Sequence, residues 1–166
     1  MRLLEAGPEA VTPGREVRSV AGGYLVQDRD HQLGEGQWKV VSRRPPSESE
    51  MQAMRLGWKL VRFVKSNAVV FSTLDQLLGV GAGQMSRVDA VRLAGMKAAQ
   101  AGLELQGAAM ASDAFFPFTD GVEVAAEMGI KAVIQPGGSV RDEAVIAAAD
   151  SNDMSMILTG SRHFRH

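Results

Sequence analysis

The sequence contains no cysteine, which excludes a disulfide framework and a thiolate metal site. It has no excess of either charge, because 18 basic and 19 acidic side chains give a net charge of −1 at pH 7. Proteins that bind nucleic acid through charge need a concentrated basic surface, so this class is disfavoured. No apolar run reaches the roughly 18 residues of a membrane span, and the N-terminus lacks the apolar segment of a secretory signal. These absences favour a protein of the reducing cytoplasm that binds neither membranes nor nucleic acid.

The chain is long enough for one compact domain with its own core. Residues 1–16 are rich in glycine, proline and glutamate and indicate an extended lead-in. Residues 17–27 predict a strand with a bulge or bend at Gly22 and Gly23, and 38–41 a short strand. We therefore expect a lead-in segment with short strands over residues 1–46 and an α/β domain over 47–166.

The domain is expected to begin with a helix, because Ser47-x-x-Glu50 is a capping-box pattern followed by apolar residues at helical spacing up to about residue 64. From residue 77 onward predicted strands and helices alternate, which implies crossover connections and helices on both faces of a sheet. The expected strands are 68–71, 77–80, 108–111, 132–135 and 156–159, and the further helices are 86–100, 120–129 and 140–149. This order predicts a three-layer α/β/α sandwich with a mixed, mostly parallel sheet.

A glycine-rich segment, GVGAGQMSR at 79–87, runs from a strand into a helix. Gly79, Gly81 and Gly83 either let the backbone approach a ligand or form a tight strand-to-helix turn. Arg87 lies in the first turn of the helix, where a cation opposes the helix dipole. An anion paired with the guanidinium would offset that cost.

A second segment, SDAFFPFTD at 112–120, combines aromatic rings with a proline and acids. Strands often bury aromatic side chains, but Pro117 interrupts the strand, so we expect at least one ring to face a cleft. A flat ring suits stacking on an imidazole or a pterin. Asp120 could simply cap the next helix. Together the two segments predict a pocket for a flat, anionic small molecule.

Three further candidates have ordinary structural alternatives. Asn67 is either a turn former or a carboxamide that donates and accepts in one plane. Ser139 fits a capped loop before a helix. Arg162, in the terminal RHFRH, is either a solvated charge or a phosphate clamp. The two histidines of that tail have no carboxylate or cysteine beside them in sequence, so zinc is not expected.

Four ordered segments, GVGAGQMSRVDAVRLA, ASDAFFPF, IQPGGSVRDEAVI and TGSRHFRH, resemble the C-terminal part of the bifunctional purine-biosynthesis enzyme that combines AICAR formyltransferase and IMP cyclohydrolase. The resemblance runs over residues 2–166, corresponds to the last half of the transformylase region, and implies a cytidine-deaminase-like subdomain without zinc. It implies formyl transfer from 10-formyltetrahydrofolate to AICAR, and a structural potassium ion near the C-terminus. The implied substrate contacts are Asn67, Arg87, Phe115 and Arg162, and the implied folate contacts are Val88, Asp120, Ser139 and Val140.

The resemblance also shows what this sequence lacks. The family's proton transfer depends on a Lys-His pair in the upstream half of the transformylase, and no Lys-His dipeptide occurs here. Thr119 replaces an arginine that is common in relatives. We therefore expect no catalytic residue in this chain, and a site completed in a homodimer or by association with the missing upstream half. The alternatives are a non-catalytic nucleotide- or folate-binding module and a structural remnant.

Overall fold

The computed structural model describes residue 5 and residues 14–30 and 33–165, so most of the expected lead-in over 1–16 lies outside the described residues. Backbone contacts divide the chain into two units, Met1–Leu33 and Gly34–His166. Within the described part of the chain, no helix has the length and apolar character needed to cross a membrane.

The first unit contains a β-hairpin of β1 (Arg15–Val20) and β2 (Gly23–Asp28). The strands are antiparallel, with Val17 opposite Val26 and Ser19 opposite Tyr24. Gly22 has a φ of 83°, a value that a residue without a Cβ adopts easily, and the chain reverses there. The prediction of one strand with a bulge or bend over 17–27 is therefore wrong, because the glycine pair forms a turn between two paired strands.

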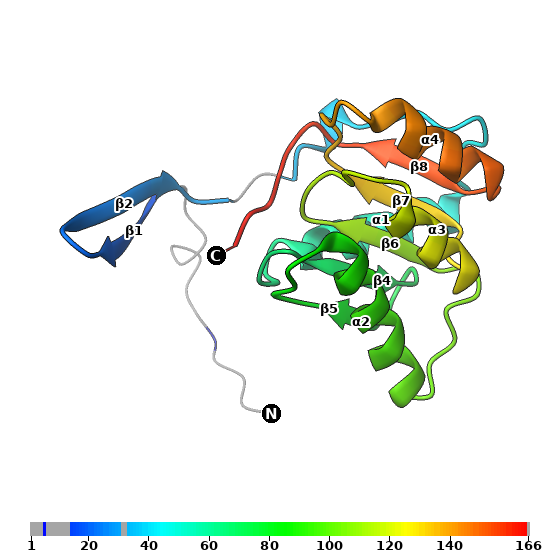
Figure 1. Ribbon diagram of the computed structural model, residues 1–166, viewed down its shortest axis with the longest axis horizontal. Helices are drawn as coiled ribbons and strands as arrows, with labels where there is room; N and C mark the ends of the chain where they lie inside the picture. The colour runs from blue at the N-terminus through cyan, green and yellow to red at the C-terminus, as the bar shows by residue number, and fades with distance from the viewer. Residues whose placement is uncertain (1–4, 6–13, 31–32, 166) are drawn as a thin grey trace. The chain divides into compact units, whose positions relative to one another are not determined.

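The second unit is built around a six-stranded sheet in the order β3–β8–β7–β6–β4–β5 (Figure 1). The strands are β3 (Lys39–Val40), β4 (Val69–Ser72), β5 (Leu77–Gly81), β6 (Ala109–Ser112), β7 (Ala132–Gln135) and β8 (Ser155–Leu158). The pairs β6–β7 and β7–β8 are parallel, whereas β4 is antiparallel to both β5 and β6, and β3 to β8. The strands β5, β6, β7 and β8 thus run in one direction, which gives the predicted mixed, mostly parallel sheet. Because β3 pairs with β8, it belongs to this unit although its sequence lies within the expected lead-in.

Four α-helices cover the two faces of this sheet: α1 (Glu48–Val61), α2 (Arg87–Gln100), α3 (Asp120–Glu127) and α4 (Asp142–Ser151). Helix α1 packs on β4, β6 and β7. Helix α2 packs on β5 and β4, α3 lies between α2 and α4, and these three share the opposite face (Figure 1). The predicted three-layer α/β/α sandwich is confirmed.

The first two helices begin as the sequence predicts. Ser47 Oγ accepts a hydrogen bond from the amide of Glu50 at 3.2 Å, and the Glu50 carboxylate accepts one from the amide of Ser47 at 2.7 Å. This completes the capping box of α1. Ser86 Oγ accepts from the amide of Asp89 at 3.2 Å and caps α2 in the same way.

The start of α4 differs from the prediction. The helix was expected to begin at residue 140, but it begins at Asp142. The Asp142 carboxylate accepts hydrogen bonds from the amides of Gly138 at 2.6 Å and Ser139 at 3.1 Å, so it stabilises the preceding loop. Because these bonds hold Gly138 and Ser139 in the loop, the first helical turn forms two residues later than the sequence pattern suggested.

The glycines of β5 allow helix α2 to pack closely on the strand. A Cβ added at Gly81 would lie 1.8 Å from the carbonyl oxygen of Ala90, and one at Gly79 would lie 2.2 Å from that of Ala94. No side chain fits at these distances, so the two glycines allow the backbone of α2 to approach the strand. Gly83, with a φ of 65°, lies in the turn that follows. The close approach predicted for this segment is therefore made by the protein's own helix at Gly79 and Gly81.

Candidate functional site

A cavity of about 340 Å³ lies at the edge of the sheet where β5 and β6 end and where α2 and α3 begin. Binding sites in α/β proteins commonly lie at this carboxyl edge of the strands. The cavity is lined by Asn67, Met85, Ser86, Arg87, Val88, Phe115, Pro117, Phe118 and Asp120. It therefore brings together residues from three separate segments of the sequence, including five of the eight predicted contacts.

Arg87 lies in the wall of the cavity and is only 8% exposed. Its Nη1 donates hydrogen bonds to Ser112 Oγ at 3.0 Å and to the carboxylate of Asp113, and its Nη2 donates to Asn67 Oδ1 at 3.0 Å. Asp113 is completely buried and forms an ion pair with the guanidinium. The anion expected beside Arg87 is therefore present within the chain itself, and it offsets the unfavourable position of the cation at a helix N-terminus.

Asn67 uses both ends of its carboxamide. Its Nδ2 donates to the carbonyl oxygens of Gln84 at 2.8 Å and Met85 at 3.2 Å, while its Oδ1 accepts from Arg87. The peptide bond between Ser66 and Asn67 is cis. The side chain thus fixes the loop before α2 and also forms part of the cavity wall, so the two interpretations of Asn67 do not exclude each other.

The aromatic segment divides between the core and the cavity. Phe116 is 1% exposed and packs in the core, and its amide donates to the Oε1 of the buried Gln135 at 3.2 Å. Phe115 is half-buried and Phe118 is exposed, and both line the cavity beside Pro117. The hydrogen bond from Phe116 to Gln135 therefore fixes the loop, and the rings of Phe115 and Phe118 in the same loop face the cavity.

Two helix N-termini border the cavity. Val88 lies in the first turn of α2 and is half-buried. Asp120 is the exposed first residue of α3, and its Oδ1 accepts from the amide of Gly121 at 2.8 Å. Thr119 holds the N-cap position without a side-chain hydrogen bond. The amide groups and the positive dipole ends at these two termini favour a ligand that carries negative charge.

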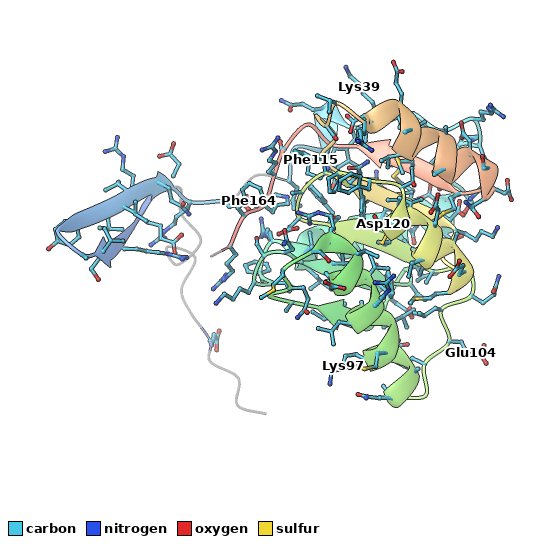
Figure 2. All side chains as sticks on the ribbon, viewed as in Figure 1. Lys39, Lys97, Glu104, Phe115, Asp120 and Phe164 are labelled. Carbon is cyan, nitrogen blue, oxygen red and sulfur yellow. The ribbon has the colours of Figure 1, made fainter. Side chains whose placement is uncertain are left out.

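Arg162 reaches the aromatic wall from the C-terminal tail (residues 159–165). Its guanidinium carbon lies 4.8 Å from the centroid of the Phe115 ring and 5.9 Å from that of the Phe164 ring. Figure 2 labels both rings, and Figure 1 shows the tail leaving β8 at this edge of the sheet. Arg162 does not line the cavity itself, but it stacks on Phe115, which does.

Hydrogen bonds hold the tail on both sides of Arg162. The amide of His163 donates to the carbonyl oxygen of Asp113 at 2.9 Å. Further along, the amide of Arg165 donates to Ser66 Oγ at 3.1 Å, and its carbonyl oxygen accepts from the amide of Ser66 at 2.9 Å. The tail is therefore fixed to the ends of β6 and of the loop that carries Asn67.

Ser139 and Val140 do not line the cavity. Ser139 lies in the loop that Asp142 holds, and the Val140 side chain is fully exposed. Their neighbour Arg141 stacks over Phe118, with its guanidinium carbon 4.8 Å from the ring centroid. The loop thus reaches the cavity through Arg141, whereas the two predicted residues do not.

A family model for the AICARFT/IMPCHase bienzyme matches residues 1–97 of the chain. The chain belongs to this family. Membership of the AICARFT/IMPCHase bienzyme family supports a role related to purine biosynthesis. The matched range contains Asn67, Arg87 and Val88 and ends within α2. The aromatic segment and the C-terminal tail lie beyond it.

Asp113, which is bonded to Arg87 in this AICARFT/IMPCHase site, is not among the site residues predicted from the sequence. From the segment SDAFFPFTD, the sequence predicts only Phe115 and Asp120 as site residues. Two signals could have found Asp113: Arg87 requires a nearby anion, and Asp113 directly follows a strand buried at every position. Ser112, the last residue of that strand, is also absent from the predicted site residues.

Among the described residues, the structure contains no group of three or more His, Cys, Asp or Glu suited to a metal ion. The His163 ring is buried against Trp58, with the centroids 4.3 Å apart and the planes tilted by 53°. His166 lies outside the described residues. Packing against the tryptophan accounts for the burial of His163.

Proposed function

We propose that this chain is a component of AICAR formyltransferase, which transfers a formyl group from 10-formyltetrahydrofolate to AICAR. The observation that carries the proposal is the cavity itself, because it collects Asn67, Arg87, Val88, Phe115 and Asp120 from distant parts of the sequence. These are contacts that the resemblance to the C-terminal transformylase region implied. Membership of the AICARFT/IMPCHase bienzyme family supports a role related to purine biosynthesis, with which this proposal agrees.

The proposal divides the cavity between the two ligands. The nucleotide contacts Asn67, Arg87, Phe115 and Arg162. The folate contacts Val88 and Asp120 in the cavity, and extends to Ser139 and Val140 in the loop before α4. The division is supported by the hydrogen bond between Arg87 and Asn67 and by the stacking of Arg162 on Phe115. The exposed carboxylate of Asp120 is suited to accept hydrogen bonds from the amino groups of a pterin.

Formyl transfer requires two positioned substrates, a proton acceptor and a donor that stabilises the tetrahedral oxyanion. The substrate amine attacks the formyl carbon, the bond from that carbon to the folate nitrogen breaks, and a proton passes from the attacking amine to the released folate nitrogen. The cavity supplies positioning through Phe115 and Arg87, but its lining contains neither histidine nor lysine. We therefore propose that the proton-transfer groups come from the family's upstream Lys-His half, and that this chain contributes binding residues.

The resemblance also implies a potassium ion near the tail. One oxygen in this region is suited to a cation: Asp113 Oδ2 is buried and has no hydrogen-bond partner in the described structure. Its residue is bonded to the tail through His163. We propose that a bound potassium ion would be held in part by this oxygen, beside the ion pair that the other carboxylate oxygen makes with Arg87.

Calorimetric titration of the chain with AICAR, and then with a folate analogue, tests the proposed function. Saturable binding of AICAR that Arg87→Ala and Phe115→Ala each weaken would support a nucleotide site in the cavity. Circular dichroism of both variants must show that they remain folded. If neither ligand binds the folded chain, these residues do not form a binding site in the chain alone.

One observation fits an alternative function equally well. The sequence has no Lys-His dipeptide, which fits a non-catalytic nucleotide- or folate-binding module as well as a component of an enzyme. The two functions differ in one assay, in which the chain is mixed with a protein that carries the upstream half. Formyl transfer that neither protein performs alone supports the enzyme component, whereas unchanged binding without turnover supports the module. A structural remnant would neither bind nor react.

A further inference from the structure

Asp113 is buried behind the cavity and is bonded to two parts of its wall. Its carboxylate accepts a hydrogen bond from Arg87, and its carbonyl oxygen accepts one from the amide of His163, next to Arg162. The residue itself does not line the cavity, and its side chain has no exposed surface. Any effect of Asp113 on a ligand in the cavity must therefore pass through its neighbours.

The strongest of these connections is to Arg87. An arginine has five N–H groups in a rigid fork, so two bonds that fix its Nη atoms also fix the direction of the remaining donors. Ser112 and Asp113 hold Nη1, and Asn67 holds Nη2. Of these three partners only Asp113 is charged, and removing one member of a buried ion pair leaves the other charge uncompensated.

We propose that Asp113 is a positioning residue for ligand binding, which holds the guanidinium of Arg87 at the cavity wall. The proposal rests on the proposed function, because AICAR is the ligand whose binding reports it. Asp113 sets where the Arg87 donors point and neutralises the cation while the cavity is empty. Arg87 then meets a ligand as a directed hydrogen-bond donor, without having to move from another partner.

The test is a double-mutant cycle of Asp113→Asn and Arg87→Ala, measured by calorimetric titration with AICAR. Because hydrogen bonds to charged groups contribute about 1.5–3 kcal/mol, Asp113→Asn is expected to weaken AICAR binding by a factor on the order of ten or more. In the Arg87→Ala background, the same substitution should change the affinity by less than about twofold. Equal losses in both backgrounds would overturn the proposal, since Asp113 would then act by another route, such as a bound cation.

Asp150→Asn is the matched control. The substitution also removes one negative charge. The Asp150 carboxylate accepts a hydrogen bond from the amide of Arg43 at 2.8 Å, and Asp150 lies at the end of α4 away from the loop near the cavity. This variant should bind AICAR as the unmodified chain does. A loss as large as that of Asp113→Asn would mean that removal of any carboxylate weakens binding, which would overturn the proposal.

A measurement without ligand separates this proposal from the proposed function. In the NMR spectrum of the unmodified chain, the guanidinium N–H signals of Arg87 should be resolved and slow to exchange, and Asp113→Asn should shift and broaden them. If AICAR fails to bind but these signals respond, the proposed function fails and the positioning role stands. If the signals do not respond, the positioning role fails whatever AICAR does.

The single substitution leaves a buried cation without its counterion, so Asp113→Asn could fail to fold. The double variant Arg87→Ala with Asp113→Asn removes both charges. A folded double variant beside an unfolded Asp113→Asn would itself demonstrate the coupling and support the proposal. Loss of folding in both, with Arg87→Ala folded, would show that Asp113 serves the fold independently of Arg87 and would overturn it.

Discussion

Arg44 and Glu50 form a bidentate ion pair in which Nη1 and Nη2 of the arginine each donate to one carboxylate oxygen at 2.8 Å. Nη2 also donates to the carbonyl oxygen of Lys131 at 2.7 Å. The same carboxylate accepts from the amide of Ser47 in the capping box of α1. One carboxylate therefore connects the start of α1 to the segment that enters β7.

This pair predicts a specific dependence of stability on pH. Burial alone would raise the pKa of Glu50, but the hydrogen bonds from Arg44 and Ser47 and the charge of Arg44 together hold that pKa below its ordinary value of 4.5. A carboxyl group with a lowered pKa in the folded state contributes stability that is present above its unfolded pKa and is lost as the pH falls through the folded pKa. Glu50→Gln should therefore flatten the decline in the free energy of unfolding below pH 4.5. Urea denaturation from about pH 6 to about pH 3 measures this slope.

Glu48→Gln is the control for that experiment, because it removes an exposed carboxylate from the same helical turn. Both variants are compared with the unmodified chain at each pH. An acid dependence in Glu50→Gln identical to that of the unmodified chain would contradict the role assigned to the Arg44–Glu50 pair.

The contact between β5 and α2 predicts a large effect of one methyl group. Gly81→Ala would place a Cβ 1.8 Å from the carbonyl oxygen of Ala90, so the helix must move away from the strand. Overpacking of this kind costs about 1–3 kcal/mol or more in the free energy of unfolding. Gly36→Ala is the matched control, since a Cβ at Gly36 meets no atom within 4 Å. Equal stability of the two variants in urea denaturation would contradict the close approach.

The division of the cavity predicts opposite selectivity for two substitutions. Arg87→Ala should weaken binding of AICAR more than binding of a folate analogue, because Arg87 is bonded to Asn67 on the proposed nucleotide side. Asp120→Asn should do the reverse, because its exposed carboxylate lies at the start of α3 on the proposed folate side. Each loss should be about tenfold, as expected for one hydrogen bond to a charged group. Titration of both variants with both ligands is the measurement, and equal losses for the two ligands would count against the division.

The apolar face of the hairpin predicts self-association. Val17, Tyr24 and Val26 share one face of β1 and β2 and are 59%, 74% and 55% exposed. An isolated two-stranded hairpin is at best marginally stable, and exposed apolar patches commonly form protein interfaces. We expect light scattering at micromolar concentration to give twice the chain mass of 17.7 kDa. Val17→Ser combined with Val26→Ser should lower the dimer fraction, and a monomer in the unmodified chain would refute the prediction.

Local patterns were sufficient to predict most elements of the fold. The capping residues Ser47 and Ser86 mark the starts of α1 and α2 because their hydrogen bonds are made within one turn. The alternation of strands and helices after residue 77 gave the layered architecture. The hairpin over 15–28 was missed because pairing between strands depends on register, which a single apolar run does not reveal.

The site was harder to predict, since its parts meet only in three dimensions. Arg87 and Phe115 could be predicted from their own segments, but the bond between Arg87 and Asp113 joins the start of helix α2 to the residue after β6. The role of the glycines of β5 was also hard to predict from the sequence. Gly79 and Gly81 are required by the helix that packs on them, a contact that looks in sequence like a ligand-binding turn.

The tail that carries Arg162 also orders the assembly of the cavity in time. Proteins are synthesised from the N-terminus, and a segment can fold only after it has left the ribosome. Asn67, Arg87 and Phe115 precede the tail in the chain, so the walls they form can come together first. The bonds from His163 to Asp113 and from Arg165 to Ser66 can form only after the tail has also left the ribosome. Until the tail has emerged, the cavity therefore lacks the support of these bonds, and the site becomes complete only when they form.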